Sequence, residues 1–202
     1  MLFLDELPEY PRSTLEALRQ PLEDRQIHLS RLYGRITYPA DFLMVATMNP
    51  CPCGYLGDSA TQCTCSQLQI DAYKRRISGP LLDRIDLRLK ISKINHEHFF
   101  DTETLNNNQH LKVLEMVKCA RSMQKKRYNR SDIYNAYVSI DDVKSLFHVT
   151  DGAKKVLNRA SKKLALSSRS YLRILRVART IADLDQSETL EEFHIAEAIQ
   201  YR

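Results

Sequence analysis

The sequence contains no tryptophan, and it has only 5 glycines and 7 prolines among its 202 residues. With 43% hydrophobic and 27% charged residues, this composition excludes collagen-like and disordered chains and is typical of globular proteins. No apolar run approaches the roughly 20 residues that a membrane-spanning helix needs, and no basic segment precedes the first apolar residues as in a signal peptide. We therefore expect a cytoplasmic protein.

The net charge of +5 is unevenly distributed along the chain. Residues 1–100 contain 12 basic and 12 acidic side chains, whereas residues 101–202 contain 18 and 13. Within the second half, residues 118–130 and 154–179 carry six and nine basic side chains and no acidic one. Such clusters favour phosphate-bearing partners, although a solvated helix face is the commoner explanation of any single basic run.

The first half of the chain carries strand signals. Residues 2–4 and 42–48 are nearly continuous apolar runs, which are typical of parallel strands buried on both faces. Residue spacing and turn signals predict further elements as follows: a helix over 11–22, a β-hairpin over 27–38, a helix over 67–77, a helix beginning at Ser78-Gly79-Pro80, and a half-buried strand over 85–91.

Helical spacing replaces strand signals after about residue 105. It predicts helices over 108–128, 140–147, 151–164, 168–184 and 190–201. The fold class that follows is an α/β core of parallel strands with helices over residues 1–104, followed by an all-α domain over residues 105–202.

Polar side chains follow both apolar strands of the first half. Asp5 and Glu6 follow the first strand, and Asn49 follows the second. Because ligands bind beyond the carboxyl ends of parallel strands, these three side chains are expected to meet in one crevice. Nucleotide hydrolysis needs such a set, with one carboxylate near Mg²⁺ and a second one to polarise the attacking water. An Asp-Glu pair alone is weak evidence, since adjacent acids after a strand are common.

Two further segments make the pattern specific, namely Thr47-Met48-Asn49-Pro50 and Ser78-Gly79-Pro80-Leu81-Leu82-Asp83-Arg84-Ile85-Asp86. In this order, the motifs resemble those of magnesium-chelatase-like AAA+ ATPases of the ComM (YifB) type, relatives of magnesium chelatase ATPase subunits and MCM helicases. The resemblance covers essentially the whole chain. It implies a partial P-loop AAA+ core with a helical lid, ATP and Mg²⁺ as cofactors, a ring that is a hexamer, and DNA remodelling such as branch migration in recombination.

The resemblance also implies roles for individual residues. Asp5 matches the Walker B position near Mg²⁺, and Glu6 matches the base that activates water. Asn49 matches sensor 1, between the water and the γ-phosphate. The remaining roles are Arg84 as the arginine finger inserted into a neighbouring subunit, Arg169 and then Arg173 as sensor 2 contacts to ATP, and Arg31 and Arg35 as DNA contacts on a pore-facing hairpin around Gly34.

The chain departs from the family in one respect. None of its glycines is followed by Lys-Ser or Lys-Thr, so the phosphate-cradling Walker A motif G-x-x-x-x-G-K-[ST] is absent from these 202 residues. The chain thus resembles a C-terminal portion, without the Walker A segment and without the N-terminal domain related to the Lon protease fold. We expect ATPase activity in the intact protein, and very weak ATP binding with no hydrolysis by the 202-residue chain alone.

Four of the five cysteines lie within 15 residues, at Cys51, Cys53, Cys63 and Cys65. In a reducing compartment such a cluster favours structural Zn²⁺ over disulfides. The C-x-C spacing is less diagnostic than C-x-x-C, and free thiols or a redox pair remain alternatives. Cys119 is expected to be a small buried hydrophobic residue.

Two other functions remain open at the level of the sequence. One is a magnesium chelatase subunit that inserts Mg²⁺ into a porphyrin with partner subunits. The other, from a different class, is a non-enzymatic, zinc-dependent nucleic-acid-binding module, which the basic clusters would suit.

Overall fold

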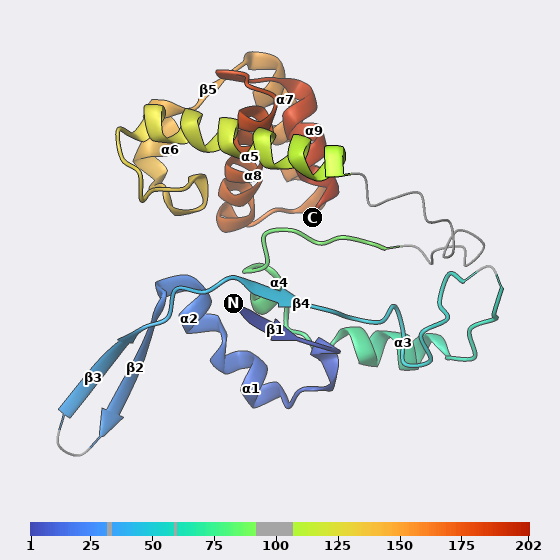
Figure 1. Cartoon of the computed structure of the whole chain (residues 1–202). Coiled ribbons are helices and arrows are strands. Elements are labelled where there is room, and N and C mark those ends of the chain that lie inside the picture. Colours follow the sequence, from blue (N-terminus) through green and yellow to red (C-terminus); the bar gives the residue numbers. More distant parts are fainter. Residues whose placement is uncertain (32–33, 59, 92–106) are drawn as a thin grey trace. The chain divides into compact units, whose positions relative to one another are not determined.

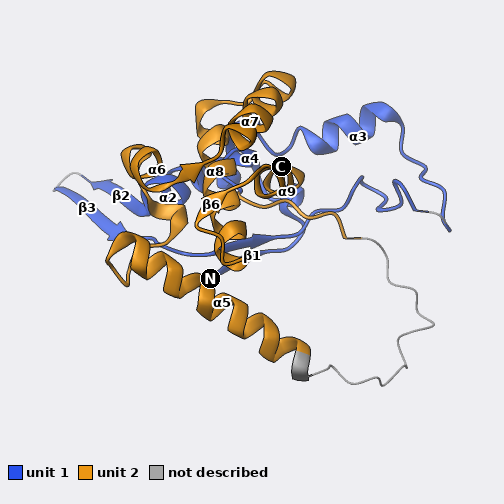
Figure 2. Cartoon of the chain, turned by 90° about the horizontal axis from the view of Figure 1, so that it is seen from above, with its two compact units in different colours: residues 1–85 blue, residues 86–202 orange. Residues whose placement is uncertain are grey.

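The computed structural model describes residues 1–31, 34–58, 60–91 and 107–202. They form two compact units, Met1–Ile85 and Asp86–Arg202, which Figure 2 shows in different colours. The domain boundary predicted between residues 104 and 105 lies outside the described residues and stays a prediction. Within the described part of the chain, the helices are too short or too polar to cross a membrane.

Two parallel strands form the centre of the first unit (Figure 1). Strand β1 (Leu2–Leu4) pairs in parallel with β4 (Met44–Ala46), so that Leu4 lies opposite Ala46. The predicted parallel pairing is therefore confirmed. Burial on both faces is wrong for these strands, since Phe3 and Val45 are 55% and 39% exposed. The core of this unit packs only against the face that carries Leu4 and Ala46.

The buried core residues are Leu7, Leu15, Ile77 and Leu81. Short helices supply all of them except Ile77, which lies between α3 and α4. The helices are η1 (Leu7–Glu9), α1 (Arg12–Ala17), α2 (Arg19–Asp24), α3 (Gln67–Lys74) and α4 (Gly79–Leu82). The single helix predicted over 11–22 is divided into α1 and α2, because Pro21 has no N–H to donate to the carbonyl of residue 17. The start of α4 is confirmed, with the Ser78 side chain accepting the Leu81 N–H and Pro80 in the first turn.

The predicted hairpin is also present. Strands β2 (Gln26–Arg31) and β3 (Gly34–Pro39) pair antiparallel from Gln26↔Pro39 to Arg31↔Gly34. The hairpin projects beyond the helices of its unit (Figure 1), and nearly all of its residues are exposed. Such a two-stranded ribbon contributes little to the core and offers both of its faces to other molecules.

The second unit is helical, as predicted. Its helices are α5 (Asn107–Tyr128), η3 (Asn135–Tyr137), α6 (Ile140–Leu146), α7 (Asp151–Leu164), α8 (Ser168–Leu184) and α9 (Glu192–Gln200). The apolar face of α8 supplies much of the core, including Ile174, Ala178 and Ala182. One addition corrects the all-α prediction: two-residue strands β5 (His148–Val149) and β6 (Thr189–Leu190) pair in parallel and join the starts of α7 and α9.

The half-buried strand predicted over 85–91 is wrong. These residues form no strand, and Leu87 and Leu89 are exposed. Instead, the Arg88 N–H donates a hydrogen bond of 2.8 Å to the Tyr201 carbonyl, at the end of the helical unit. Alternating apolar residues form a strand only where a neighbouring strand supplies a hydrogen-bond ladder, and the sequence pattern carries no information on that neighbour.

Candidate functional site

The carboxyl ends of β1 and β4 bring together the side chains that the sequence placed in one crevice. The pairing of the two strands continues one step beyond the sheet, since the Thr47 N–H donates to the Leu4 carbonyl at 3.0 Å and the Leu7 N–H donates to the Thr47 carbonyl at 2.9 Å. Asp5 and Glu6 therefore lie against Thr47, although more than 40 residues separate them along the chain.

Thr47 is the residue at this site that sequence reasoning missed. Its hydroxyl donates a hydrogen bond of 2.5 Å to Asp5 Oδ1 and accepts the Glu6 backbone N–H at 2.9 Å. One side chain thus orients the carboxylate of Asp5 and the backbone of Glu6. The sequence does contain a signal for this role: Thr47 carries a hydroxyl group, directly follows an apolar strand and precedes Asn49 by two residues.

Glu6 has an unusual backbone conformation for a residue other than glycine. Its φ of 49° and ψ of 55° lie in the left-handed helical region, which costs an L-residue about 1–2 kcal/mol. Strained residues of this kind cluster at functional sites, where surrounding contacts hold them in place. The conformation turns the chain directly after β1, and the Asn49 Nδ2 lies 3.4 Å from Glu6 Oε1.

The resulting arrangement has a definite chemistry. Asp5, Glu6 and Asn49 are all exposed, so a ligand can reach them. Two carboxylates with an amide opposite the second one can bind a hydrated Mg²⁺ ion and orient a water molecule. The predicted convergence of these three residues is present, whereas their catalytic roles stay predictions.

Arg84 is placed by α4 and engages the neighbouring helix α2. Its guanidinium forms an ion pair with Glu23, and its Nε donates to the Arg19 carbonyl at 3.0 Å. The Nη1 donates to the Pro80 carbonyl at 2.6 Å. The side chain is only 11% exposed, and this burial, followed by the charge of Arg19, lowers its pKa. A role in a neighbouring subunit requires Arg84 to exchange Glu23 for another anion.

Arg169 and Arg173 lie in the first two turns of α8, in the second unit. Ser167 caps this helix by accepting the Ser170 N–H. Arg173 Nη1 lies 3.4 Å from Asp86 Oδ1, and burial lowers the pKa of Arg173 against the opposing effect of Asp86. Both arginines belong to a different unit from Asp5 and Glu6, and their sensor 2 role stays a prediction.

The basic hairpin residues lie near the described ends of β2 and β3. Arg31 pairs with Gly34 and Arg35 with Ser30, and both arginines are exposed. Gly34 has a φ of 150°, a value that an L side chain rarely adopts. The exposed position of the two arginines is compatible with contacts to a polyanion.

The four clustered cysteines meet in space. Their sulfur atoms all lie within 4.8 Å of one another, so the cluster is compatible with a structural zinc ion. Cys51 is buried and the other three are partly buried, and all four are free thiols. Backbone hydrogen bonds from Tyr55 and Thr64 lower the pKa of Cys53 to about 5. Cys119 belongs to the second unit, where it lies on α5 and is partly buried.

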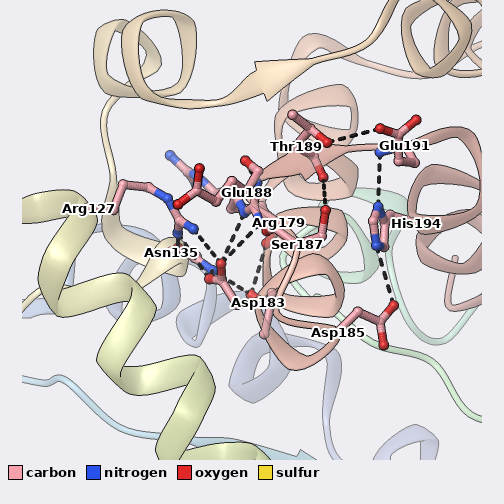
Figure 3. A network of polar contacts seen from close by, with 12 residues as sticks. Arg127, Asn135, Arg179, Asp183, Asp185, Ser187, Glu188, Thr189, Glu191 and His194 are labelled. Carbon is pink, nitrogen blue, oxygen red and sulfur yellow. Dashed lines mark hydrogen bonds and ion pairs between the residues drawn. The ribbon is translucent and has the colours of Figure 1, made fainter.

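A buried polar network in the helical unit was not predicted (Figure 3). Asp183 and Arg179 are both fully buried and form an ion pair. Arg127 also pairs with Asp183 from α5, and Asn135 Nδ2 donates to Asp183 Oδ2 at 2.8 Å. A solvated helix face, the commoner explanation of the basic run over residues 118–130, is therefore wrong for Arg127. This network holds α5, η3 and α8 together.

Comparison with known proteins gives two family matches. The family described as "Magnesium chelatase, subunit ChlI" matches residues 1–99, and "Magnesium chelatase, subunit ChlI C-terminal" matches residues 108–202. Over its full length the chain is 41% identical to the uncharacterized protein YifB of Escherichia coli (strain K12) and 40% identical to the competence protein ComM of Haemophilus influenzae. It is 36% identical to Rv2897c of Mycobacterium tuberculosis. The chain spans 39%, 38% and 39% of these three relatives.

Proposed function

The chain belongs to the magnesium chelatase ChlI family, and on this basis we propose that it supplies the metal-binding and water-activating half of an AAA+ ATPase site. The observation that carries the proposal is the convergence of Asp5, Glu6 and Asn49 through the hydroxyl of Thr47. Mg²⁺, when bound with ATP, neutralises charge on the phosphates. With both bound, Asp5 would hold the ion, Glu6 would accept a proton from the attacking water, and Asn49 would orient that water.

The other half of the site lies outside these 202 residues, since no Walker A motif is present among them. Backbone N–H groups and a lysine of a P-loop are needed to bind the phosphates. The intact protein is therefore the ATPase in this proposal. The chain alone is inactive, because it can polarise a water molecule but has no means of holding the phosphate that the water attacks.

In this proposal, the remaining arginines complete the site in a ring, which we take to be a hexamer. Arg84 acts in the site of the neighbouring subunit after releasing Glu23, where its charge stabilises the transferred phosphoryl group. Arg169, with Arg173 as the second choice, contacts the nucleotide from the helical lid. Each of these assignments rests on the resemblance of the surrounding motif.

DNA is the substrate that we propose for the work of the ring, in the form of branch migration or a similar remodelling reaction. Supporting features are the exposed Arg31 and Arg35 on a projecting hairpin and the basic excess of residues 101–202. A role as a magnesium chelatase subunit is the alternative that the family name suggests. If the intact protein binds branched DNA with an affinity that falls steeply as the salt concentration rises, this favours DNA remodelling over the chelatase role.

Metal dependence tests the proposal. ATP turnover is measured against Mg²⁺ concentration in a longer protein that carries this chain behind a P-loop. Asp5→Asn is expected to raise the Mg²⁺ concentration needed for half-maximal turnover by about tenfold or more, because a charge-assisted contact is worth about 1.5–3 kcal/mol. Asp24→Asn, at an exposed acid of α2, is the matched control. An Asp5→Asn protein with the Mg²⁺ dependence of the wild type would contradict the assignment.

A further inference from the structure

The segment between β4 and α3 contains four thiols that the ATP site does not use. Cys51 and Cys53 lie at its start, and Cys63 and Cys65 lie just before α3. The sulfur atoms lie 3.4 Å apart for Cys51–Cys53, 3.7 Å for Cys51–Cys63 and 3.5 Å for Cys53–Cys63. A disulfide requires about 2.05 Å. Four thiolates around a zinc ion, with Zn–S bonds of about 2.3 Å in a tetrahedron, lie about 3.8 Å apart.

Local backbone geometry presents the sulfur atoms to one another. The Gly54 N–H donates to the Cys51 carbonyl at 3.0 Å and closes a tight turn, and Gly54 ends this turn with a φ of 80°. A second turn follows, with the Asp58 N–H bonded to the Tyr55 carbonyl at 3.1 Å and Gly57 at a φ of 83°. Left-handed backbone at both glycines disfavours any side chain there. These turns place the first cysteine pair against the second one.

The described part of the segment buries few side chains. Among the described residues from Pro52 to Gln69 none is buried, and residues 47–66 contain no helix or strand where the structure describes them. Cys51, in contrast, is fully buried. Ordering a residue costs about 1–2 kcal/mol of backbone entropy, and a segment without an apolar core must offset that cost in another way. Metal coordination by thiolates is a common means, because ion binding then contributes directly to folding.

The chemistry of the four sulfur donors indicates which ion such a site would bind. Four sulfur ligands in a tetrahedral arrangement suit Zn²⁺ or iron, and they exclude Mg²⁺ and Ca²⁺, which prefer oxygen. A site with four protein ligands has no open position for a substrate, so the ion is structural rather than catalytic.

We propose that Cys51, Cys53, Cys63 and Cys65 coordinate one structural Zn²⁺ ion. The ion closes the segment from Cys51 to Cys65 and fixes the chain immediately after Asn49, which is two residues before Cys51. The metal site does not depend on the ATPase proposal, because it rests on the four sulfur atoms alone. Loss of the ion would release the segment that follows β4 without removing any side chain of the ATP site.

Metal content of the 202-residue chain tests this proposal. The protein is purified anaerobically without chelators and analysed by mass spectrometry of the elements. We expect about one zinc ion per chain in the wild type and less than a tenth of that in Cys51→Ser and Cys65→Ser. Cys119→Ser, outside the cluster, is the matched control and keeps its zinc. Replacement of Zn²⁺ by Co²⁺ gives the wild type and the control the intense visible absorption of a tetrahedral thiolate site, which the two cluster variants lack.

Three results would overturn the proposal. The first is wild-type protein without stoichiometric metal after purification in the presence of added Zn²⁺. The second is stoichiometric iron in place of zinc, and the third is zinc content in Cys65→Ser equal to that of the wild type. The Cys51→Ser variant can be lost to misfolding because Cys51 is buried. In that case, the zinc content of the wild type and of Cys65→Ser still tests the proposal, since Cys65 is only partly buried. None of these readings depends on ATP hydrolysis, so the metal site and the ATPase proposal can fail separately.

Discussion

At the scale of single residues, Thr47 shows what the sequence can and cannot predict about the site. Asp5, Glu6 and Asn49 could be predicted because each follows an apolar strand, which is a local pattern. The role of Thr47 could not be predicted in the same way. Its hydroxyl reaches residues 41 and 42 positions away, and that contact exists only because β1 and β4 pair in one particular register.

Replacement of Thr47 tests this positioning role. Thr47→Val keeps the shape of the side chain and removes both hydrogen bonds, so Asp5 loses a partner that orients its carboxylate and Glu6 loses a partner of its backbone N–H. We expect turnover of a longer, P-loop-bearing protein to fall by about tenfold to 100-fold, because misplacement of a catalytic group by about 1 Å has effects of that size. Stability should fall by only about 0.5–1.5 kcal/mol.

Thr47→Ser provides the control, since it restores the hydroxyl without the methyl group. Its turnover and its Mg²⁺ dependence should return to within a few-fold of the wild type. Equal activity of Thr47→Val and Thr47→Ser would show that the hydroxyl has no positioning role, whatever the change in stability.

At the scale of elements, helices were predicted better than the contacts between them. The spacing of the apolar residues of α8 is a local property of the sequence, and it predicts this helix as it predicts the other long helices. The buried group of Arg127, Arg179 and Asp183 was not found, because charged residues usually lie at the surface unless a partner compensates them. That partner comes from another helix. The predicted strand over 85–91 failed for a similar reason, since pairing depends on a neighbour outside the segment.

Asp183 makes this buried network testable (Figure 3). Asp183→Asn keeps the size of the side chain but leaves the charges of Arg127 and Arg179 without their carboxylate. We expect the helical unit to lose about 3–5 kcal/mol, which is the usual effect of removing one partner of a buried ion pair. Loss of helical circular dichroism in urea measures the change. Asp151→Asn, at an exposed acid of α7, should change stability by less than about 1 kcal/mol. Similar losses in the two variants would contradict the structural role of the network.

At the scale of the whole chain, the organisation into two parts was predicted from the change of residue spacing, and the described residues do form two units. The assignment of individual residues to the two units is harder to predict from the sequence. Residues 86–91 belong by their contacts to the helical unit, although their alternating pattern resembles a strand of the first unit. The local alternation of apolar and polar residues does not predict long-range contacts such as the hydrogen bond from the Arg88 N–H to the Tyr201 carbonyl.

The central claim is that Glu6 activates water in an ATP site that this chain completes. The most direct measurement compares ATP binding and single-turnover hydrolysis by Glu6→Gln and wild type, in a longer protein that carries this chain behind a P-loop. Loss of the general base should slow hydrolysis by about 10²–10⁴-fold. Binding should be unchanged, because the P-loop holds the phosphates. Glu9→Gln, at an exposed acid three residues further on, should hydrolyse ATP like the wild type. Wild-type hydrolysis by Glu6→Gln would contradict the claim.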